Sequence, residues 1–198
     1  MMDSQEAYKG DMFPAGTEGL PEVKKTRIID LKDGDVYELS AGYVKQTIGG
    51  KEVRRLAYNG MIPGPTIRTK KGARVTVNFT NNLDINTTVH AHGLRGEDTY
   101  DGVPIEMGGK QEPMKPGETF TYQWDFPDTG LFWYHPHIRT DYTTDAGLQG
   151  NFWVTQDGYW NDVDQEELLV LDDYTPEEPF FAAKAVKTLM GRFGSVML

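Results

Sequence analysis

Hydrophobic and polar residues alternate along many short segments of this chain. The clearest case is residues 74–81, in which Val75, Val77 and Phe79 alternate with polar residues. Because successive side chains of a strand point to opposite sides, this pattern predicts a strand with one buried face. Similar patterns predict nine strands in all, over residues 27–31, 36–45, 53–58, 66–69, 74–81, 87–92, 119–126, 131–137 and 151–155.

Turn-forming residues separate these segments. Examples are residues 63–65 (Pro-Gly-Pro) and residues 128–130 (Asp-Thr-Gly), and similar clusters of Gly, Asn and Asp lie between the other pairs. The pattern contains no alternation of strands with helices and no internal repeat. Many short strands with turns at this rhythm are typical of an antiparallel β-sandwich or barrel, so the sequence predicts an all-β fold.

The pattern changes near Trp160. Residues 166–174 (EELLVLDDY) predict one more strand, and a short helix is predicted to begin at Thr175 and end at Gly191. The last residues are apolar again, and an apolar face needs a partner surface. We therefore expect three parts: an N-terminal arm (1–22), a main domain (23–158), and a linker with the opening strands of an incomplete second domain (159–198).

Composition narrows the function classes. The chain has 198 residues, 38% of them hydrophobic, which is enough for a substantial core. Its net charge of −10 argues against nucleic acid or an anionic membrane as a partner. No apolar run is long enough to span a membrane, and no signal peptide is visible. We expect a cytoplasmic protein, or a periplasmic or extracellular one whose leader has been removed.

All four histidines of the chain occur in two pairs, His90 with His92 and His135 with His137. Residues two apart project from the same face of a strand, so two such strands side by side would bring four imidazoles together. Imidazole is a common metal ligand. With no cysteine in the chain, iron–sulfur and thiolate zinc sites are excluded, and copper, zinc, iron or nickel fit an all-imidazole site.

One rival interpretation concerns the first pair alone. His90 and His92 followed by Glu97 resemble the metal motif of the cupins, which would indicate a stand-alone mononuclear metalloenzyme. The second cupin histidine is missing, however, and this interpretation leaves His135 and His137 unexplained.

A stronger resemblance covers most of the chain. It rests on six segments in order: YNGMIPGPTIRTKKGARVTVNFTNNL (58–83), TVHAHGL (88–94), DGVP (101–104), PGETFTYQW (116–124), GLFWYHPH (130–137) and GLQGNFWV (147–154). Together they resemble the N-terminal cupredoxin domain of a laccase-type multicopper oxidase. The resemblance implies a cupredoxin-like Greek-key β-sandwich and a copper-dependent oxidoreductase that reduces dioxygen to water.

The same resemblance implies roles for particular residues. His90 would bind the type 2 copper of a trinuclear cluster, and His92, His135 and His137 would bind the type 3 pair. Asp101 of the DGVP segment would help to deliver protons to oxygen. The acids with weaker claims to that role are Glu97, Asp98 and Asp141.

Some residues near the pairs have less certain roles. Ala91 stands where the family usually has tryptophan, which should alter packing and leave ligation intact. Trp133 and Tyr134 would either shield the site from water or serve as ordinary core aromatics.

The chain holds only part of what the resemblance implies. The family's cluster takes eight histidines, and four are present. A type 1 copper site needs a cysteine thiolate, which this chain lacks. We therefore expect a second polypeptide that carries the rest of the second domain and a cysteine-containing cupredoxin domain. The alternative is a copper-binding or storage protein without turnover. The reducing substrate, a phenol or a metal ion, is left open.

Overall fold

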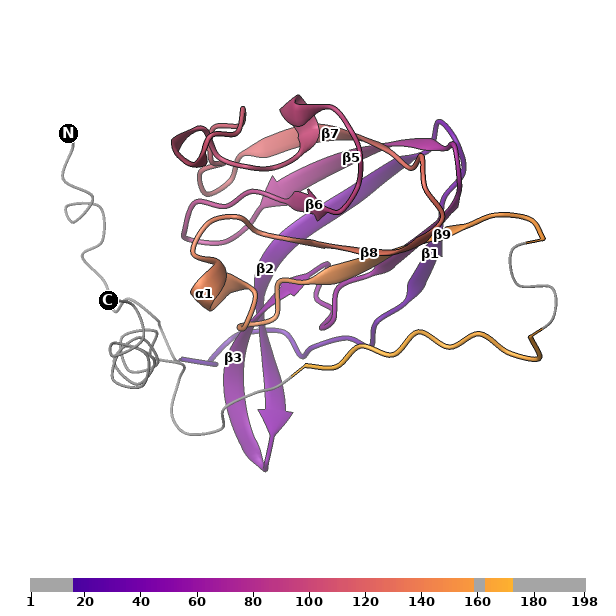
Figure 1. The fold of residues 1–198 in the computed structure, drawn as a ribbon. Coiled ribbons are helices and arrows are strands. Elements are labelled where there is room, and N and C mark those ends of the chain that lie inside the picture. Colours follow the sequence, from indigo (N-terminus) through magenta and orange to yellow (C-terminus); the bar gives the residue numbers. More distant parts are fainter. Residues whose placement is uncertain (1–15, 159–162, 173–198) are drawn as a thin grey trace, which may run out of the picture.

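The computed structural model describes residues 16–158 and 163–172 of the chain (Figure 1). Every one of the nine predicted segments contains a strand. The strands are β1 (Ile28–Asp30), β2 (Val36–Ile48), β3 (Lys51–Tyr58), β4 (Thr66–Lys70), β5 (Arg74–Asn81), β6 (His90–His92), β7 (Thr119–Asp125), β8 (Gly130–His135) and β9 (Gly150–Thr155). Short turns of helix connect some of them: η1 (Asp98–Tyr100), η2 (Ile105–Met107) and α1 (Thr140–Thr143).

The strands form two sheets that make a β-sandwich. One sheet has the order β1-β4-β9-β8-β6, and the other has the order β3-β2-β5-β7. The prediction of an all-β, cupredoxin-like sandwich is confirmed, but the expectation of purely antiparallel sheets is wrong. The pairs β1·β4, β2·β5 and β4·β9 are parallel. Two neighbouring strands that run parallel need a crossover connection. Here the chain crosses to the other sheet before it returns to form the second strand of each parallel pair.

Aromatic side chains fill the space between the sheets. Trp124 on β7 lies against Tyr134 and Phe152 of the opposite sheet, with ring centroids 6.1 and 5.1 Å apart. Phe79 on β5 packs edge-on against Tyr58, and all of these side chains belong to one buried core. The alternation seen in the sequence is thus the alternation between this core and the outer faces of the sheets.

The strand predicted over residues 166–174 is not formed in residues 166–172, which the structure describes as irregular chain. Leu169 and Leu171 are 78% and 94% exposed there. A strand needs a ladder partner for its backbone groups, and this segment has no such partner among the described residues. The predicted helix from Thr175 to Gly191 lies outside the described residues. No helix in the described part of the chain is long and apolar enough to cross a membrane.

Candidate metal centre

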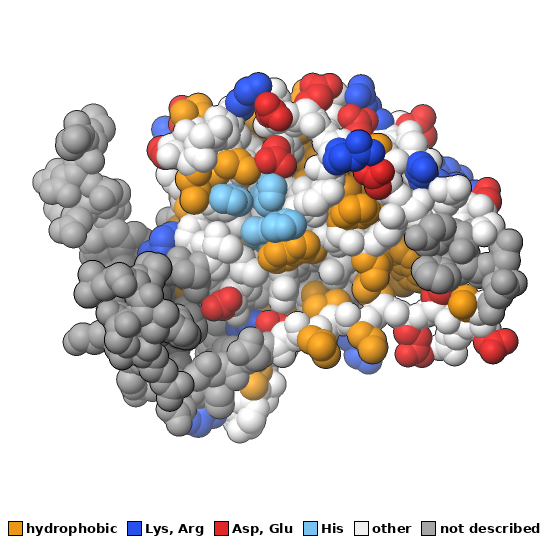
Figure 2. Space-filling model, in the orientation of Figure 1, with side chains coloured by type: hydrophobic (Ala, Val, Ile, Leu, Met, Phe, Trp, Pro, Cys, Tyr) orange, Lys and Arg blue, Asp and Glu red, His pale blue; other side chains and the backbone are white. Residues whose placement is uncertain are grey.

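The two histidine pairs meet at one edge of the five-stranded sheet. The edge strand β6 pairs antiparallel with β8, which sets His90 opposite His135 and His92 opposite Trp133. Ala91 and Tyr134, which lie opposite each other between these positions, are buried in the core. Because side chains alternate along a strand, the imidazoles project from the outer face. Figure 2 shows the histidine side chains gathered on one face of the molecule.

Three of the imidazoles are close enough to share a metal ion. The ligand atoms of His90, His92 and His135 all lie within 4.8 Å of one another. The ring centroid of His137 lies 5.2 Å from that of His90 and 6.2 Å from that of His135. The structure therefore brings all four predicted side chains to one place, with three in a tight group and the fourth beside them.

His137 reaches this place by a different route from the one expected. The strand predicted over 131–137 ends at His135, so simple alternation does not position His137. Instead its backbone N–H donates a hydrogen bond to the buried hydroxyl of Thr88, at 3.1 Å. This hydrogen bond thus positions His137, which lies beyond the last residue of strand β8.

Hydrogen bonds fix the tautomers of two rings. The Nδ1 atom of His90 lies 2.6 Å from the backbone oxygen of Asp101, and that of His135 lies 2.8 Å from the backbone oxygen of Pro136. A carbonyl oxygen can only accept, so each of these rings carries its proton on Nδ1. The Nε2 lone pairs of both rings are then available for a metal ion.

His92 and His135 also contact each other. The Nδ1 atom of His92 lies 3.2 Å from Nε2 of His135. Since the proton of His135 is on its other nitrogen, His92 is the donor and Nε2 of His135 the acceptor. A metal ion bound at Nε2 of His135 would take the place of this hydrogen bond.

His135 is held in its neutral form. The pKa of His135 is lowered to about 4, chiefly by burial and to a smaller extent by the neighbouring imidazoles, while the hydrogen bond to the backbone oxygen of Pro136 opposes this shift. Neutral imidazole is the form that binds metal ions. Trp133 stacks on this ring, with centroids 3.9 Å apart and planes 18° apart. Of the two aromatics considered from the sequence, Trp133 therefore lies against the site and Tyr134 belongs to the core.

Asp101 lies against the same group of rings. Its backbone oxygen accepts from Nδ1 of His90 and from the backbone N–H of Ala91, and its carboxylate Oδ1 lies 3.3 Å from Nδ1 of His90. Gly102 allows this close approach. Its φ is +79°, and a Cβ atom there would lie only 2.0 Å from the backbone oxygen of Val89.

The other acids considered from the sequence have different surroundings. Glu97 lies 3.9 Å from Arg74, and Asp98 pairs with Lys110 at 3.2 Å. The side chain of Asp141 lies outside what the structure describes. Asp101 is thus the candidate acid that the structure places against an imidazole.

Sequence reasoning missed two contributors to the site, Thr88 and Met107. Thr88 stands two residues before His90, so the same alternation that linked the histidines could have found it. Met107 stands in the loop after Asp101, and its sulfur lies 3.3 Å from Nδ1 of His137. No spacing rule connects a loop residue with a ring on another strand, so no signal for Met107 was present.

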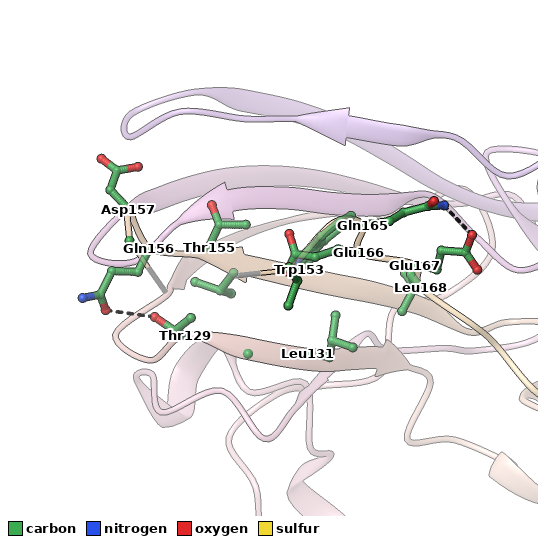
Figure 3. A pocket seen from close by; sticks show the side chains of 14 residues that line it. Thr129, Leu131, Trp153, Thr155, Gln156, Asp157, Gln165, Glu166, Glu167 and Leu168 are labelled. Carbon is green, nitrogen blue, oxygen red and sulfur yellow. Dashed lines mark hydrogen bonds between the residues drawn. The ribbon is translucent and has the colours of Figure 1, made fainter. Parts of the chain in front are cut away.

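A separate pocket of about 720 Å³ lies at the opposite end of β8 (Figure 3). Leu131 and Trp153 contribute apolar surface to it, and Asp157, Glu166 and Glu167 contribute carboxylates. Its lining contains no histidine. The four histidines therefore lie away from this pocket, toward the other end of the strand.

Comparison with known proteins identifies the class. A family model for multicopper oxidase matches residues 40–158, more than half of the chain, so this chain belongs to the multicopper oxidase family. It is 30% identical over 161 residues to copper resistance protein A of Pseudomonas syringae pv. tomato, covering 80% of this chain and 26% of that protein. It is 36% identical over 137 residues to multicopper oxidase MCE of Talaromyces pinophilus, covering 68% and 21%.

Solved structures agree. The multi-copper oxidase from Pseudomonas thermotolerans superposes with a TM-score of 0.58 at 36% identity, covering 64% of this chain and 30% of that one. The blue copper oxidase from Nitrosomonas europaea superposes with a TM-score of 0.57 at 33% identity, covering 63% and 39%. The resemblance to an N-terminal cupredoxin domain of this family is confirmed. The chain spans about a quarter of the length of the curated relatives it matches.

The residues present fit copper. The donor set consists of imidazoles, and at His90 and His135 hydrogen bonds leave Nε2 as the binding atom. Imidazole suits copper in both common oxidation states, and the chain has no thiolate that would favour a different cluster. The cupin interpretation finds no support, because the family is that of the multicopper oxidases and Glu97 faces Arg74.

Proposed function

We propose that this chain supplies half of the ligands of a trinuclear copper cluster in a laccase-type oxidase that reduces dioxygen to water. His90 would bind the type 2 copper, and His92, His135 and His137 would bind the type 3 pair. The observation that carries the proposal is the group of three imidazole donors within 4.8 Å of one another, with the fourth ring alongside. This arrangement occurs in a chain of the multicopper oxidase family.

When bound, copper would supply the one-electron redox chemistry that amino-acid side chains lack. Other residues of this chain position the imidazoles that would bind the copper. The backbone oxygens of Asp101 and Pro136 hold two rings in one tautomer, which is how outer hydrogen bonds orient metal ligands. Trp133 covers one face of His135 and keeps water from that side.

We propose that Asp101 transfers protons from solvent to the site. Its Oδ1 lies 3.3 Å from the His90 ring, and its side chain is 38% exposed. A carboxylate that touches both the site and solvent can take a proton from water at Oδ1 and hold it where oxygen is reduced. The backbone oxygen of the same residue orients His90, so the two functions of Asp101 reside in separate atoms.

The remaining ligands must come from outside this sequence. The four histidines here are half of the eight that the family's cluster takes, and a chain without cysteine holds no type 1 copper. We propose that a second polypeptide supplies the other histidines and the cysteine. It would carry the rest of a second cupredoxin domain and a cysteine-containing third one. The reducing substrate, a phenol or a metal ion, would then be selected by that partner.

Native mass spectrometry with copper analysis tests the proposal, on material purified from the source cells. The expected result is this chain in complex with a cysteine-containing polypeptide, with type 1, type 2 and type 3 copper present and oxygen consumed. If the same sequence is found continuing into the missing domains, the cluster stands and the separate partner is wrong. A chain that travels alone with copper, without oxygen consumption, would replace the oxidase with a copper-storage protein.

A further inference from the structure

At three of the four histidines, the Nδ1 atom contacts a group that is not an imidazole. The chemical nature of that group differs among the three. At His90 and His135 the contact is a backbone carbonyl oxygen, whereas at His137 it is the sulfur of Met107, 3.3 Å away. A thioether has no proton to donate, so this contact requires the proton on Nδ1 of His137. The same tautomer results at all three rings, and Nε2 of His137 is left free.

We propose that Met107 is a positioning residue for His137. Its sulfur accepts a hydrogen bond from the Nδ1–H group of His137 and thereby selects Nε2 as the metal-binding atom. At His90 and His135 a backbone carbonyl oxygen has this role. This inference rests on the proposed function in one respect only, namely that His137 binds copper. The tautomer itself is a property of the metal-free chain.

The loop that carries Met107 is built to hold it. Met107 ends the turn η2, where its N–H donates to the oxygen of Pro104 at 2.9 Å. The next residue, Gly108, has a φ of +89° and donates to the oxygen of Ile105 at 3.0 Å. Gly109 packs so closely that a Cβ atom would lie 2.0 Å from the backbone oxygen of Val103. The backbone that carries the methionine is therefore tightly folded, which fixes where its side chain begins.

A thioether is a weaker acceptor than a carbonyl, which has a consequence for the metal site. Outer hydrogen bonds raise the basicity of a ligating imidazole, and their loss typically lowers metal affinity by about 10–100-fold. Met107 is 60% exposed, so water can partly replace it. We therefore expect removal of the sulfur to lower the affinity for copper by about tenfold, near the lower end of this range.

Nitrogen-15 NMR of the histidine side chains in the metal-free full chain tests the tautomer, and titration with Cu(I) against a competing chelator tests affinity. Met107→Leu keeps the apolar bulk and removes the acceptor. It should give mixed tautomers at His137 and a loss of about tenfold in affinity. Met107→Gln offers an amide oxygen and should restore both. Ile105→Leu, in the same turn, is the control and should change neither.

Two results would overturn the proposal. One is an unchanged His137 tautomer in Met107→Leu. The other is copper–sulfur scattering in the X-ray absorption of the copper-loaded chain that Met107→Leu removes, since the sulfur would then be a ligand itself. If the unsubstituted chain binds no copper, the proposed function fails at this site, while the NMR comparison still decides the role of Met107.

Discussion

At the scale of single residues, the histidines were predictable and their supports were not. Two pairs with a spacing of two, in a chain with no other histidine, indicate a shared site. Alternation along β6 puts the first pair on one face, whereas His137 is positioned by its hydrogen bond to Thr88. The supporting contacts come from backbone oxygens of Asp101 and Pro136 and from the sulfur of Met107. Backbone oxygens occur at every residue, so a sequence does not show which of them face a ring.

His135→Ala is expected to abolish oxygen reduction by the assembled complex and to leave assembly largely intact. The change removes one of the three closely grouped donors, while the alanine stays in the ladder of β8. Oxygen consumption and native mass spectrometry measure the two effects. Thr121→Ala, on an exposed position of the other sheet, serves as control. Full activity of the His135 variant would contradict the cluster assignment.

Asp101→Asn separates the two functions of that residue. The backbone oxygen that orients His90 is kept, so copper content should stay unchanged. The amide carries no transferable proton, so turnover should fall by about 10²–10⁴-fold, the usual contribution of a positioned acid or base. Copper analysis and oxygen uptake in the assembled complex provide the comparison. Loss of copper together with activity would show that the carboxylate has a structural role instead.

At the scale of elements, alternation predicted where strands lie but not which strands are neighbours. Eight of the nine strands, all but β1, place side chains in the common core, and a buried face is the property that a period of two detects. Parallel pairs such as β4·β9 depend on crossovers between distant segments, which leave no mark in the local pattern. The apolar pattern after residue 165 failed for a related reason, because the pattern alone supplies no partner strand.

Gly102→Ala is expected to destabilise the metal-free chain and to weaken copper binding. The new Cβ atom would lie 2.0 Å from the backbone oxygen of Val89, so the Asp101 loop must move away from β6. Overpacking of this kind costs about 1–3 kcal/mol, in addition to the strain of a positive φ. Urea unfolding and copper titration measure both effects.

Gly72→Ala is the matched control for that experiment. Gly72 has a similarly positive φ, +89°, but a Cβ atom there would have open space around it. It should show the backbone strain alone, about 1–2 kcal/mol, with copper binding unchanged. Equal losses in the two variants would mean that the contact between the loop and β6 does not matter.

At the scale of the whole molecule, the motifs predicted the family and the sandwich, and the proposed cluster takes more ligands than the four histidines of this chain. We expect the full chain alone to bind copper through its imidazoles and to show no visible absorption from type 1 copper, because that absorption requires a cysteine thiolate. Oxygen uptake by the chain alone should be at background. Sustained oxygen reduction without another polypeptide would contradict the requirement for one. Visible spectroscopy and an oxygen electrode are sufficient for this test.

The position of β6 bears on the tendency of this chain to associate with other molecules through the edge of its sheet. β6 is the last strand of its sheet, and an open edge can template the addition of strands from other molecules, which leads to aggregation. This edge strand is only three residues long. The N–H of its central residue, Ala91, donates to the oxygen of Asp101, and the oxygen of Ala91 accepts from the N–H of Leu94. Little of this edge is therefore left for a stray strand, while its side chains still present two imidazoles. An edge long enough to form a stronger ladder would expose the same ligands at a greater risk of self-association.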